Sequence, residues 1–327
     1  MIEKIRGYLP GIMLSATIAL ASAYLSEHYG GPAMLFALLL GIAFNFLADS
    51  SKTGPGIQFS SKRILRVGVA LLGARITWTE VQNLGAETVA LVVSGVLVTL
   101  VVGTGIARLL KLPRSFGVLT AGAVAICGAS AALAISSVLP NDSRSERWTI
   151  VTVVGVTALS TIAMMVYPLF SAFLQFDDTA AGVFIGATIH DVAQVIGAGY
   201  TISTEAGDTA AIVKLLRVSC LLPVVVAIGF LQRGSKSADA PKVPLLPLFL
   251  FGFVVLVAAN SFGLISPDIA AFLGTVSRWC LLCAVAALGI RTSLGELAVV
   301  GPRPLLAMVS QTALLALFAI GGLLYLD

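Results

Sequence analysis

The sequence predicts an all-α, polytopic membrane protein with about eleven transmembrane segments, and composition is the first observation behind this prediction. Of the 327 residues, 58% are hydrophobic and 32 are glycine, and the mean hydropathy is +1.00. At roughly 20 residues for each membrane helix, this apolar content is enough for about eleven spans. Only 11% of the residues are charged, against roughly 25% in an ordinary soluble domain. The composition excludes a soluble enzyme, a disordered chain and a secreted disulfide-rich module, and it indicates no nucleic-acid partner.

The second observation is that apolar segments follow one another along the whole chain, with no linker long enough to separate a soluble domain. We therefore expect a single integral membrane domain over residues 1–327. The N-terminal segment lacks the small-residue cleavage pattern of a signal peptide, so it is expected to be a membrane helix. The predicted segments are 10–27, 32–48, 63–75, 86–109, 115–139, 148–173, 180–203, 208–232, 244–263, 269–291 and 301–326.

The basic residues predict how these segments are oriented. Lys and Arg cluster before the first segment and after the second, fourth and eighth, which lie on one side if every segment crosses. The positive-inside rule then places the N-terminus in the cytoplasm. Arg144 and Arg147 argue against this orientation, because they would lie outside the cell if every segment crossed the membrane. Re-entrant segments at 115–139 and 180–203 would bring them inside, so nine and eleven spans both stay open.

The third observation is an internal repeat, in which ALLGARITWTEVQNLG at 70–85 aligns with AALGIRTSLGELAVVG at 286–301. The repeat units are about 32–110 and 247–326, and seven segments separate equivalent ones, so the two copies have opposite membrane orientations. Inverted repeats are typical of secondary transporters that alternate access to a midplane site. Chance similarity of apolar sequence is the alternative. The matched scarce residues are Arg75 with Arg291, Glu80 with Glu296, Asn45 with Asn260, and Pro32 with Pro247, and Gly73 also matches Gly289.

Two segments contain the small or polar centres that predict broken helices and a transport site. The centre of segment 115–139 holds Cys127, Gly128 and Ser130, and small-residue helix packing is the alternative reading there. The centre of segment 180–203 holds His190, Asp191 and Gln194. A carboxylate in hydrocarbon costs roughly 2.5–3.5 kcal/mol on insertion scales, so Asp191 is expected to face a cavity or the bundle interior. A buried hydrogen-bond cluster that only positions helices is the alternative for this segment.

The eighth segment begins AAIVKLLRV, where Lys214 and Arg217 lie three residues apart and share a helical face. Two neighbouring cations predict an anion-binding site between them. The alternatives are snorkelling toward lipid headgroups and salt bridges to Asp191 or Glu205. Arg75 and Arg291 are expected to be interfacial anchors, with symmetric gates as the other reading.

The sequence indicates neither an enzyme nor a metalloprotein. No nucleophile has a base at a recognised spacing, no ATP-binding loop occurs, and Cys127 with His190 is the only candidate catalytic pair. Cys280 and Cys283 form a CxxC within an apolar helix, without a second ligand pair. We therefore expect no catalytic residues, no cofactor and no bound metal.

The runs AGAVAICGASAALA, GATIHDVAQVIGAG and AAIVKLLRV, with LLGARIT, resemble the YeiH family of bacterial inner-membrane proteins, described as sulfate exporters. The resemblance covers essentially the whole chain. It implies a multi-pass transporter of the bacterial inner membrane, related in architecture to the inverted-repeat fold of bile-acid symporters and sodium/proton antiporters. The family commonly has Glu after the motif histidine, whereas this chain has Asp191, which keeps the charge with a reach one methylene shorter.

The leading hypothesis is a secondary transporter that exports a small anion, such as sulfate or a sulfonate-like anion, by alternating access. The alternative is a sodium- or proton-coupled symporter for an organic anion, with Asn45, Asn260 and Asp191 as ion ligands. The expected partners are the anion, the lipid bilayer and H⁺ or Na⁺, with homo-oligomerisation left open. His190 and Asp191 are the expected coupling residues. The predicted substrate-binding residues are Lys214, Arg217, Cys127, Gly128, Ser130 and Gln194.

Overall fold

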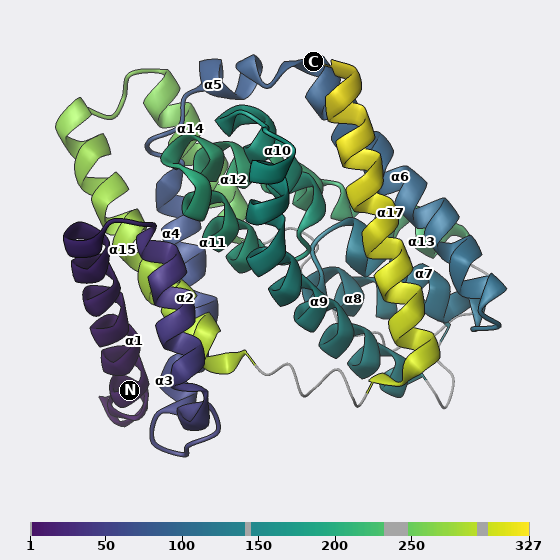
Figure 1. The fold of residues 1–327 in the computed structure, drawn as a ribbon, viewed down its shortest axis with the longest axis horizontal. Helices are drawn as coiled ribbons and strands as arrows, with labels where there is room; N and C mark the ends of the chain where they lie inside the picture. The colour runs from purple at the N-terminus through teal and green to yellow at the C-terminus, as the bar shows by residue number, and fades with distance from the viewer. Residues whose placement is uncertain (1, 141–144, 232–247, 293–299, 327) are drawn as a thin grey trace. The chain divides into compact units, whose positions relative to one another are not determined.

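The computed structural model describes residues 2–140, 145–231, 248–292 and 300–326. These residues form helices and connecting turns, with no β-strand among them, which confirms the all-α fold class (Figure 1). Among them, six helices are long and apolar enough to cross a membrane by length and composition, and three shorter apolar helices accompany them. The chain is thus a polytopic membrane protein, and the count of about eleven segments stays a prediction.

Each predicted apolar segment coincides with one helix or with consecutive helices. Segments 115–139 and 180–203 are each split into two half-helices, as their sequences predicted. The elements are α1 (Ile2–Tyr29), α2 (Ala33–Ala43), η1 (Asn45–Leu47), α3 (Gly54–Phe59), η2 (Ser60–Ile64), α4 (Leu65–Leu72), α5 (Trp78–Asn83), α6 (Gly85–Leu109), α7 (Arg114–Ala125), α8 (Ala129–Ser136), α9 (Ser145–Phe173), α10 (Asp178–Thr188), α11 (Val192–Ile202), α12 (Thr204–Ser219), α13 (Leu221–Leu231), α14 (Leu248–Ser261), α15 (Pro267–Arg291) and α17 (Pro302–Leu326).

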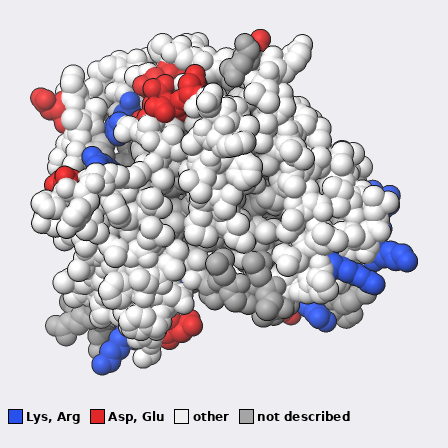
Figure 2. All heavy atoms as spheres, in the orientation of Figure 1, with Lys and Arg blue, Asp and Glu red and all other residues white. Residues whose placement is uncertain are grey.

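The described chain separates into two compact units. The first contains the described residues within Met1–Leu84, Ile196–Asp208 and Pro247–Ser293, and the second those within Gly85–Val195, Thr209–Leu246 and Leu294–Asp327. Most of the surface visible in Figure 2 is uncharged, and charged side chains gather at only a few places on it. A surface with few charged side chains is expected where a protein contacts lipid.

In the first unit, α15 packs on α2 and α4, α1 covers α2 and α3, and α14 packs on α4. Two glycines allow close approaches of this kind. A Cβ atom on Gly73 would lie 2.4 Å from the carbonyl oxygen of Phe253, and one on Gly289 would lie 2.4 Å from that of Leu38. Any side chain at either position would therefore push two helices apart.

These two glycine contacts are equivalent under the internal repeat. Gly289 is the repeat equivalent of Gly73, 216 residues later, and Phe253 is the repeat equivalent of Leu38, 215 residues later. In both contacts, a glycine of one copy therefore lies against the same position of the other copy. Two asparagines behave in the same way. The Asn45 side-chain nitrogen donates to the carbonyls of Ile290 at 2.7 Å and Thr292 at 3.0 Å. Asn260 donates to the carbonyl of Ile76, the repeat equivalent of Thr292, at 3.3 Å.

The two repeat copies can be compared over only part of their length. Residues 293–299, which include Glu296, lie outside the described residues. The last helix of each copy, α6 or α17, belongs to the second unit. The superposition of 32–110 on 247–326 therefore stays a prediction over its full length.

In the second unit, α17 lies along α6 (Figure 1), α7 packs on α6, α9 and α17, and α10 packs on α9 and α17. A buried amide joins three of these helices. The Gln311 side-chain nitrogen on α17 donates to the carbonyl of Gly103 on α6 at 2.9 Å and to the Thr120 hydroxyl on α7 at 3.0 Å. This amide and the packing contacts together fix α7 against α6 and α17.

Candidate functional site

The first helix break follows from the backbone of one glycine. Gly128 has φ +63° and ψ −125°, a conformation that L side chains rarely adopt and that glycine tolerates. The chain therefore leaves α7 after Ala125 and starts α8 at Ala129 in a new direction. Gly128 has no side chain to cap α8, so the first N–H groups of α8 have no side-chain acceptor. The exposed Ser130 hydroxyl lies 3.0 Å from both the carbonyl oxygen and the Sγ of Cys127.

The second break is set by a carboxylate at the start of a helix. Ile189 is extended, and Asp191 restarts the chain as α11 by accepting from the backbone N–H of Ala193 at 3.1 Å. Aspartate is among the preferred residues at this position, because its oxygen satisfies an otherwise unpaired N–H group. The backbone N–H of Asp191 donates to the Ser160 hydroxyl on α9 at 3.0 Å. The side chain of Asp191 is half-buried.

The two breaks lie against each other within the second unit. A Cβ atom on Gly128 would lie 3.5 Å from the Cβ of His190 and 3.8 Å from the backbone nitrogen of Asp191. We call residues Ile126–Ser130 together with Ile189–Asp191 the helix-break region. It places the ends of four half-helices at the centres of two apolar segments.

Lys214 and Arg217 hold the C-terminal ends of both first half-helices. Both side chains are buried, with exposures of 0% and 1%. The Lys214 ammonium donates to the carbonyls of Ile126 at 2.7 Å and Ile189 at 2.8 Å. The Arg217 guanidinium donates five hydrogen bonds of 2.7–3.1 Å to the carbonyls of Val124, Ala125, Gly186 and Ile189.

The side chains of Lys214 and Arg217 are both buried, so they do not extend toward lipid headgroups. The hydrogen bonds that the structure shows for them end on backbone carbonyls, so the donors that an anion would need point at those carbonyls. Those carbonyls are the ones that a helix C-terminus leaves without partners. Direct substrate binding by Lys214 and Arg217 stays a prediction, and in this conformation their visible role is to join the ends of α7 and α10.

The charges of the helix-break region add up to a positive site. Each helix C-terminus carries about −0.5 of an elementary charge and each N-terminus about +0.5. With both side chains protonated, Lys214 and Arg217 contribute about +2, against about −1 from the ends of α7 and α10. The carboxylate of Asp191 offsets the N-termini of α8 and α11, which contribute about +1 together. About one positive charge remains, which favours an anion.

The other predicted residues of this region are more enclosed. His190 and Gln194 are fully buried. The His190 Nε2 pairs with the Thr312 hydroxyl at 3.0 Å, and the Gln194 nitrogen donates to the Thr161 hydroxyl at 2.9 Å. His190 precedes α11, whereas Gln194 lies within it. Cys127 is 4% exposed.

Asn45 and Asn260 lie in the first unit, where their side-chain nitrogens tie helix ends as described above. Cation binding by their side-chain oxygens stays a prediction. In the part of the chain that the structure describes, no group of three or more His, Cys, Asp and Glu side chains is placed to hold a metal ion.

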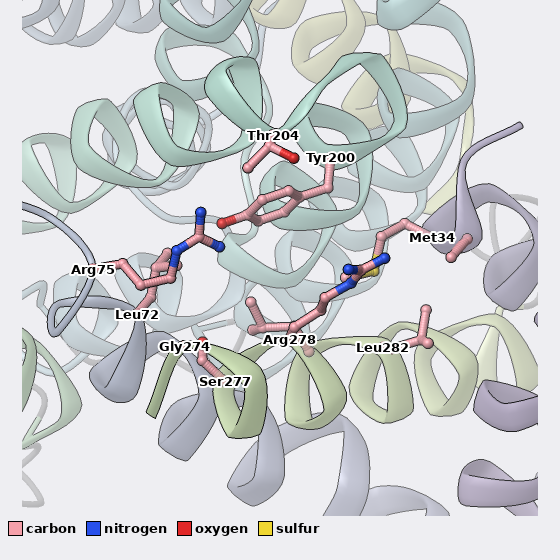
Figure 3. Close-up of a pocket in the computed structure, with 11 residues that line it drawn as sticks. Met34, Leu72, Arg75, Tyr200, Thr204, Gly274, Ser277, Arg278 and Leu282 are labelled. Atoms are coloured by element: carbon pink, nitrogen blue, oxygen red, sulfur yellow. The ribbon is translucent and has the colours of Figure 1, made fainter. Parts of the chain in front are cut away.

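Sequence reasoning missed one arrangement in the first unit. Arg75, Arg278 and Tyr200 line a pocket of about 240 Å³ (Figure 3), and Asp208 pairs with Arg75 at 3.5 Å. A signal was present, since Arg278 lies at the centre of the apolar segment 269–291. A cation in that position is expensive enough to be a functional hypothesis by default.

The chain is similar to known proteins over most of its length. Residues 10–308 match the family model described as "Conserved hypothetical protein 698". A UPF0324 membrane protein of Chlorobaculum tepidum is 49% identical over 323 residues, covering 98% of this chain and 90% of its own. The UPF0324 membrane protein TauZ of Paracoccus pantotrophus is 50% identical, covering 96% and 94%. TauZ of Paracoccus denitrificans is 48% identical, covering 98% and 96%.

Proposed function

We propose that this chain, which belongs to the UPF0324 family of membrane proteins, is a secondary transporter that exports a small anion through the helix-break region. The family is the one that the sequence motifs indicated. The observation that carries the proposal is the meeting of two broken helices, with two buried cations fixed on their C-terminal ends. This arrangement leaves a positive region at the centre of two apolar segments, where a passing anion needs stabilisation most.

The anion is proposed to bind at the N-terminus of α8. The N–H groups there lack a side-chain cap, and helix N-termini bind sulfate and similar groups. Ser130 adds an exposed hydroxyl beside them. Lys214 and Arg217 stabilise the anion through their positive charge rather than by direct contact, because their N–H groups already donate to backbone carbonyls. Sulfate and small sulfonates are the proposed substrate class.

Alternating access is proposed to use the internal repeat. The contacts of Gly73 with Phe253 and of Gly289 with Leu38 are exchanged between the copies, as two-fold related units exchange contacts. Opposite membrane orientation of the copies would give the transporter two similar conformations, open to opposite sides. The proposed setting is the bacterial inner membrane with the N-terminus in the cytoplasm.

The direction of transport is proposed from the membrane potential. A dianion that leaves an inside-negative cell gains roughly 4.6 kcal/mol per 100 mV, from about 2.3 kcal/mol for each charge. Uptake against the same potential would need at least two coupled cations. Export is therefore the simpler task for a small dianion.

Asp191 is the proposed coupling group, because it is half-buried whereas His190 is fully buried. A carboxylate at the break is also the observation that favours the second candidate, a sodium- or proton-coupled symporter for an organic anion. A cation bound at Asp191 would then neutralise the site during uptake. We propose transport, not catalysis, in either case.

Reconstitution of the purified chain in proteoliposomes tests the proposal. Labelled sulfate or methanesulfonate is loaded inside, and efflux is followed with the interior negative and then with the potential collapsed. We expect efflux that accelerates with the negative interior. Ser130→Ala should slow it, while Ser136→Ala should not, because the Ser136 hydroxyl donates only within its own helix. Uptake that requires sodium or a proton gradient would favour the symporter instead. No flux of any anion would remove the transport function.

A further inference from the structure

A pocket in the first unit gathers charged and polar side chains that the helix-break region does not use. Figure 3 shows Arg75 and Arg278 entering it from opposite sides, with the ring of Tyr200 between them. The two arginines come from widely separated parts of the chain. Arg75 follows α4, Arg278 lies on α15, and Tyr200 belongs to α11. The fold therefore assembles this group from three elements.

Arg278 is the second cation of the group. It lies eleven residues into α15, roughly 16 Å along a helix that rises about 1.5 Å per residue, and hence near the middle of a candidate membrane span. Within this group the ion pair joins Arg75 to Asp208 at 3.5 Å, and Arg278 takes no part in that pair. An arginine in this position is normally paired or faces a ligand pathway.

Asp208 already serves two other groups of the pocket. One of its oxygens accepts from the Tyr200 hydroxyl, and the other lies 3.5 Å from the Arg75 guanidinium. A tight charge-assisted hydrogen bond is about 2.7–2.9 Å long, so the pair with Arg75 is loose. In this group two guanidinium groups therefore meet a single carboxylate, that of Asp208.

The size and walls of the pocket favour a small ligand. Its volume of about 240 Å³ is below the roughly 300–1,000 Å³ of pockets that enclose drug-sized molecules. Leu72, Leu281 and Leu282 contribute apolar walls, while Arg75 and Arg278 are exposed and accessible to a ligand. Guanidinium groups bind tetrahedral oxyanions and carboxylates through two parallel hydrogen bonds.

We propose that this pocket is a binding site for a small free oxyanion, held mainly by Arg278 and also by Arg75. The ligand class is sulfate, a small sulfonate or an ion of similar shape and charge. The anion takes the open side of Arg278 and competes with Asp208 for Arg75. This site goes beyond the proposed transport function, since it uses none of the residues of the helix-break region and its occupancy does not require transport.

Equilibrium binding of labelled sulfate to the purified full-length chain in detergent tests the site, at constant ionic strength. Arg278→Gln and Arg75→Gln should each weaken binding about ten- to hundredfold, the range for a lost hydrogen bond between charged groups. Asp208→Asn should tighten binding several-fold, because it removes the competing charge and keeps an acceptor for Tyr200. Arg303→Gln, at an exposed arginine of α17, is the matched control and should bind as the wild type does.

The variants separate loss of the ligand from loss of the fold. Arg278→Lys keeps the charge but not the planar fork, so it should retain part of the affinity. Tighter binding by Asp208→Asn cannot result from misfolding. Equal affinity of Arg278→Gln and Arg303→Gln would overturn the proposal. Binding of phosphatidylglycerol in nanodiscs without binding of sulfate would also overturn it, because the group would then hold a lipid headgroup.

The pocket and the transport function can fail independently. Anion efflux with sulfate binding that does not depend on Arg278 would refute the pocket and leave transport standing. Arg278-dependent binding by a chain that moves no anion would refute transport and leave the pocket standing.

Discussion

The Lys214 ammonium and the Arg217 guanidinium donate to the same backbone oxygen, the carbonyl of Ile189, at 2.8 and 3.0 Å. Through this shared acceptor the start of the second helix break is fixed to α12. The other donors of the pair hold the end of α7. The two cations therefore stabilise the broken helices by donating to carbonyl groups that the ends of α7 and α10 leave without helical partners.

The first prediction concerns the stability of this arrangement. Arg217→Met should lower the free energy of unfolding by roughly 3 kcal/mol or more, since it leaves three buried carbonyls unpaired at about 1–3 kcal/mol each. Thermal or denaturant unfolding in detergent measures the loss. Arg217→Lys should restore part of it. Arg108→Met, at an exposed arginine of α6, should change stability by less than about 0.5 kcal/mol. Equal stability of the two Met variants would contradict the role described for Arg217.

The helix breaks were predictable because their causes are local. Glycine at 128 permits a backbone that other residues avoid, and aspartate at 191 starts a helix by capping it. The apolar helices were predictable for a similar reason, since hydrophobicity and length decide them.

The partners of the charged side chains were not predictable. A three-residue spacing places Lys214 and Arg217 on one helical face, but it does not say what that face meets. Their acceptors are backbone carbonyls, which every residue carries, so the sequence contains no trace of them. The unusual position of Arg278, by contrast, was predictable, because a cation in the middle of an apolar segment is visible in the sequence alone.

The second prediction concerns coupling at Asp191. Asp191→Asn should flatten the dependence of transport on pH between about 5 and 8, because it removes the titratable group. Asparagine caps helices about as well as aspartate, so folding should be retained. Flux in proteoliposomes across this range measures the effect. His190→Gln should shift or flatten the profile only if the buried ring also exchanges protons. A wild-type profile in both variants would leave these residues as helix-positioning groups.

The third prediction concerns the backbone at the first break. Gly128→Ala should destabilise the protein by about 1–3 kcal/mol, the usual cost of forcing a side chain into such a conformation. Nearby atoms are not the cause, since the new Cβ would lie 3.5 Å or more from its neighbours. Gly105→Ala is the control, in a helix and with nothing within 4 Å of the added atom. That change should stabilise the protein by about 0.5–1 kcal/mol, and unfolding in detergent compares the two. Stabilisation by both substitutions would refute the strain at Gly128.

The last prediction concerns the orientation of the repeat copies. Arg75 and Arg291 are equivalent positions, each at the end of a helix that the other copy contacts. If the copies are inverted, these positions face opposite sides of the membrane, with Arg75 outside and Arg291 in the cytoplasm when the N-terminus is cytoplasmic. Arg75→Cys and Arg291→Cys, each in a chain whose four native cysteines are replaced, should react with a membrane-impermeant thiol reagent from opposite sides. Intact cells and inverted vesicles supply the two sides, and a permeant reagent shows that each thiol is reactive. Labelling of both positions from the same side would mean parallel copies, and alternating access through an inverted repeat would then be wrong.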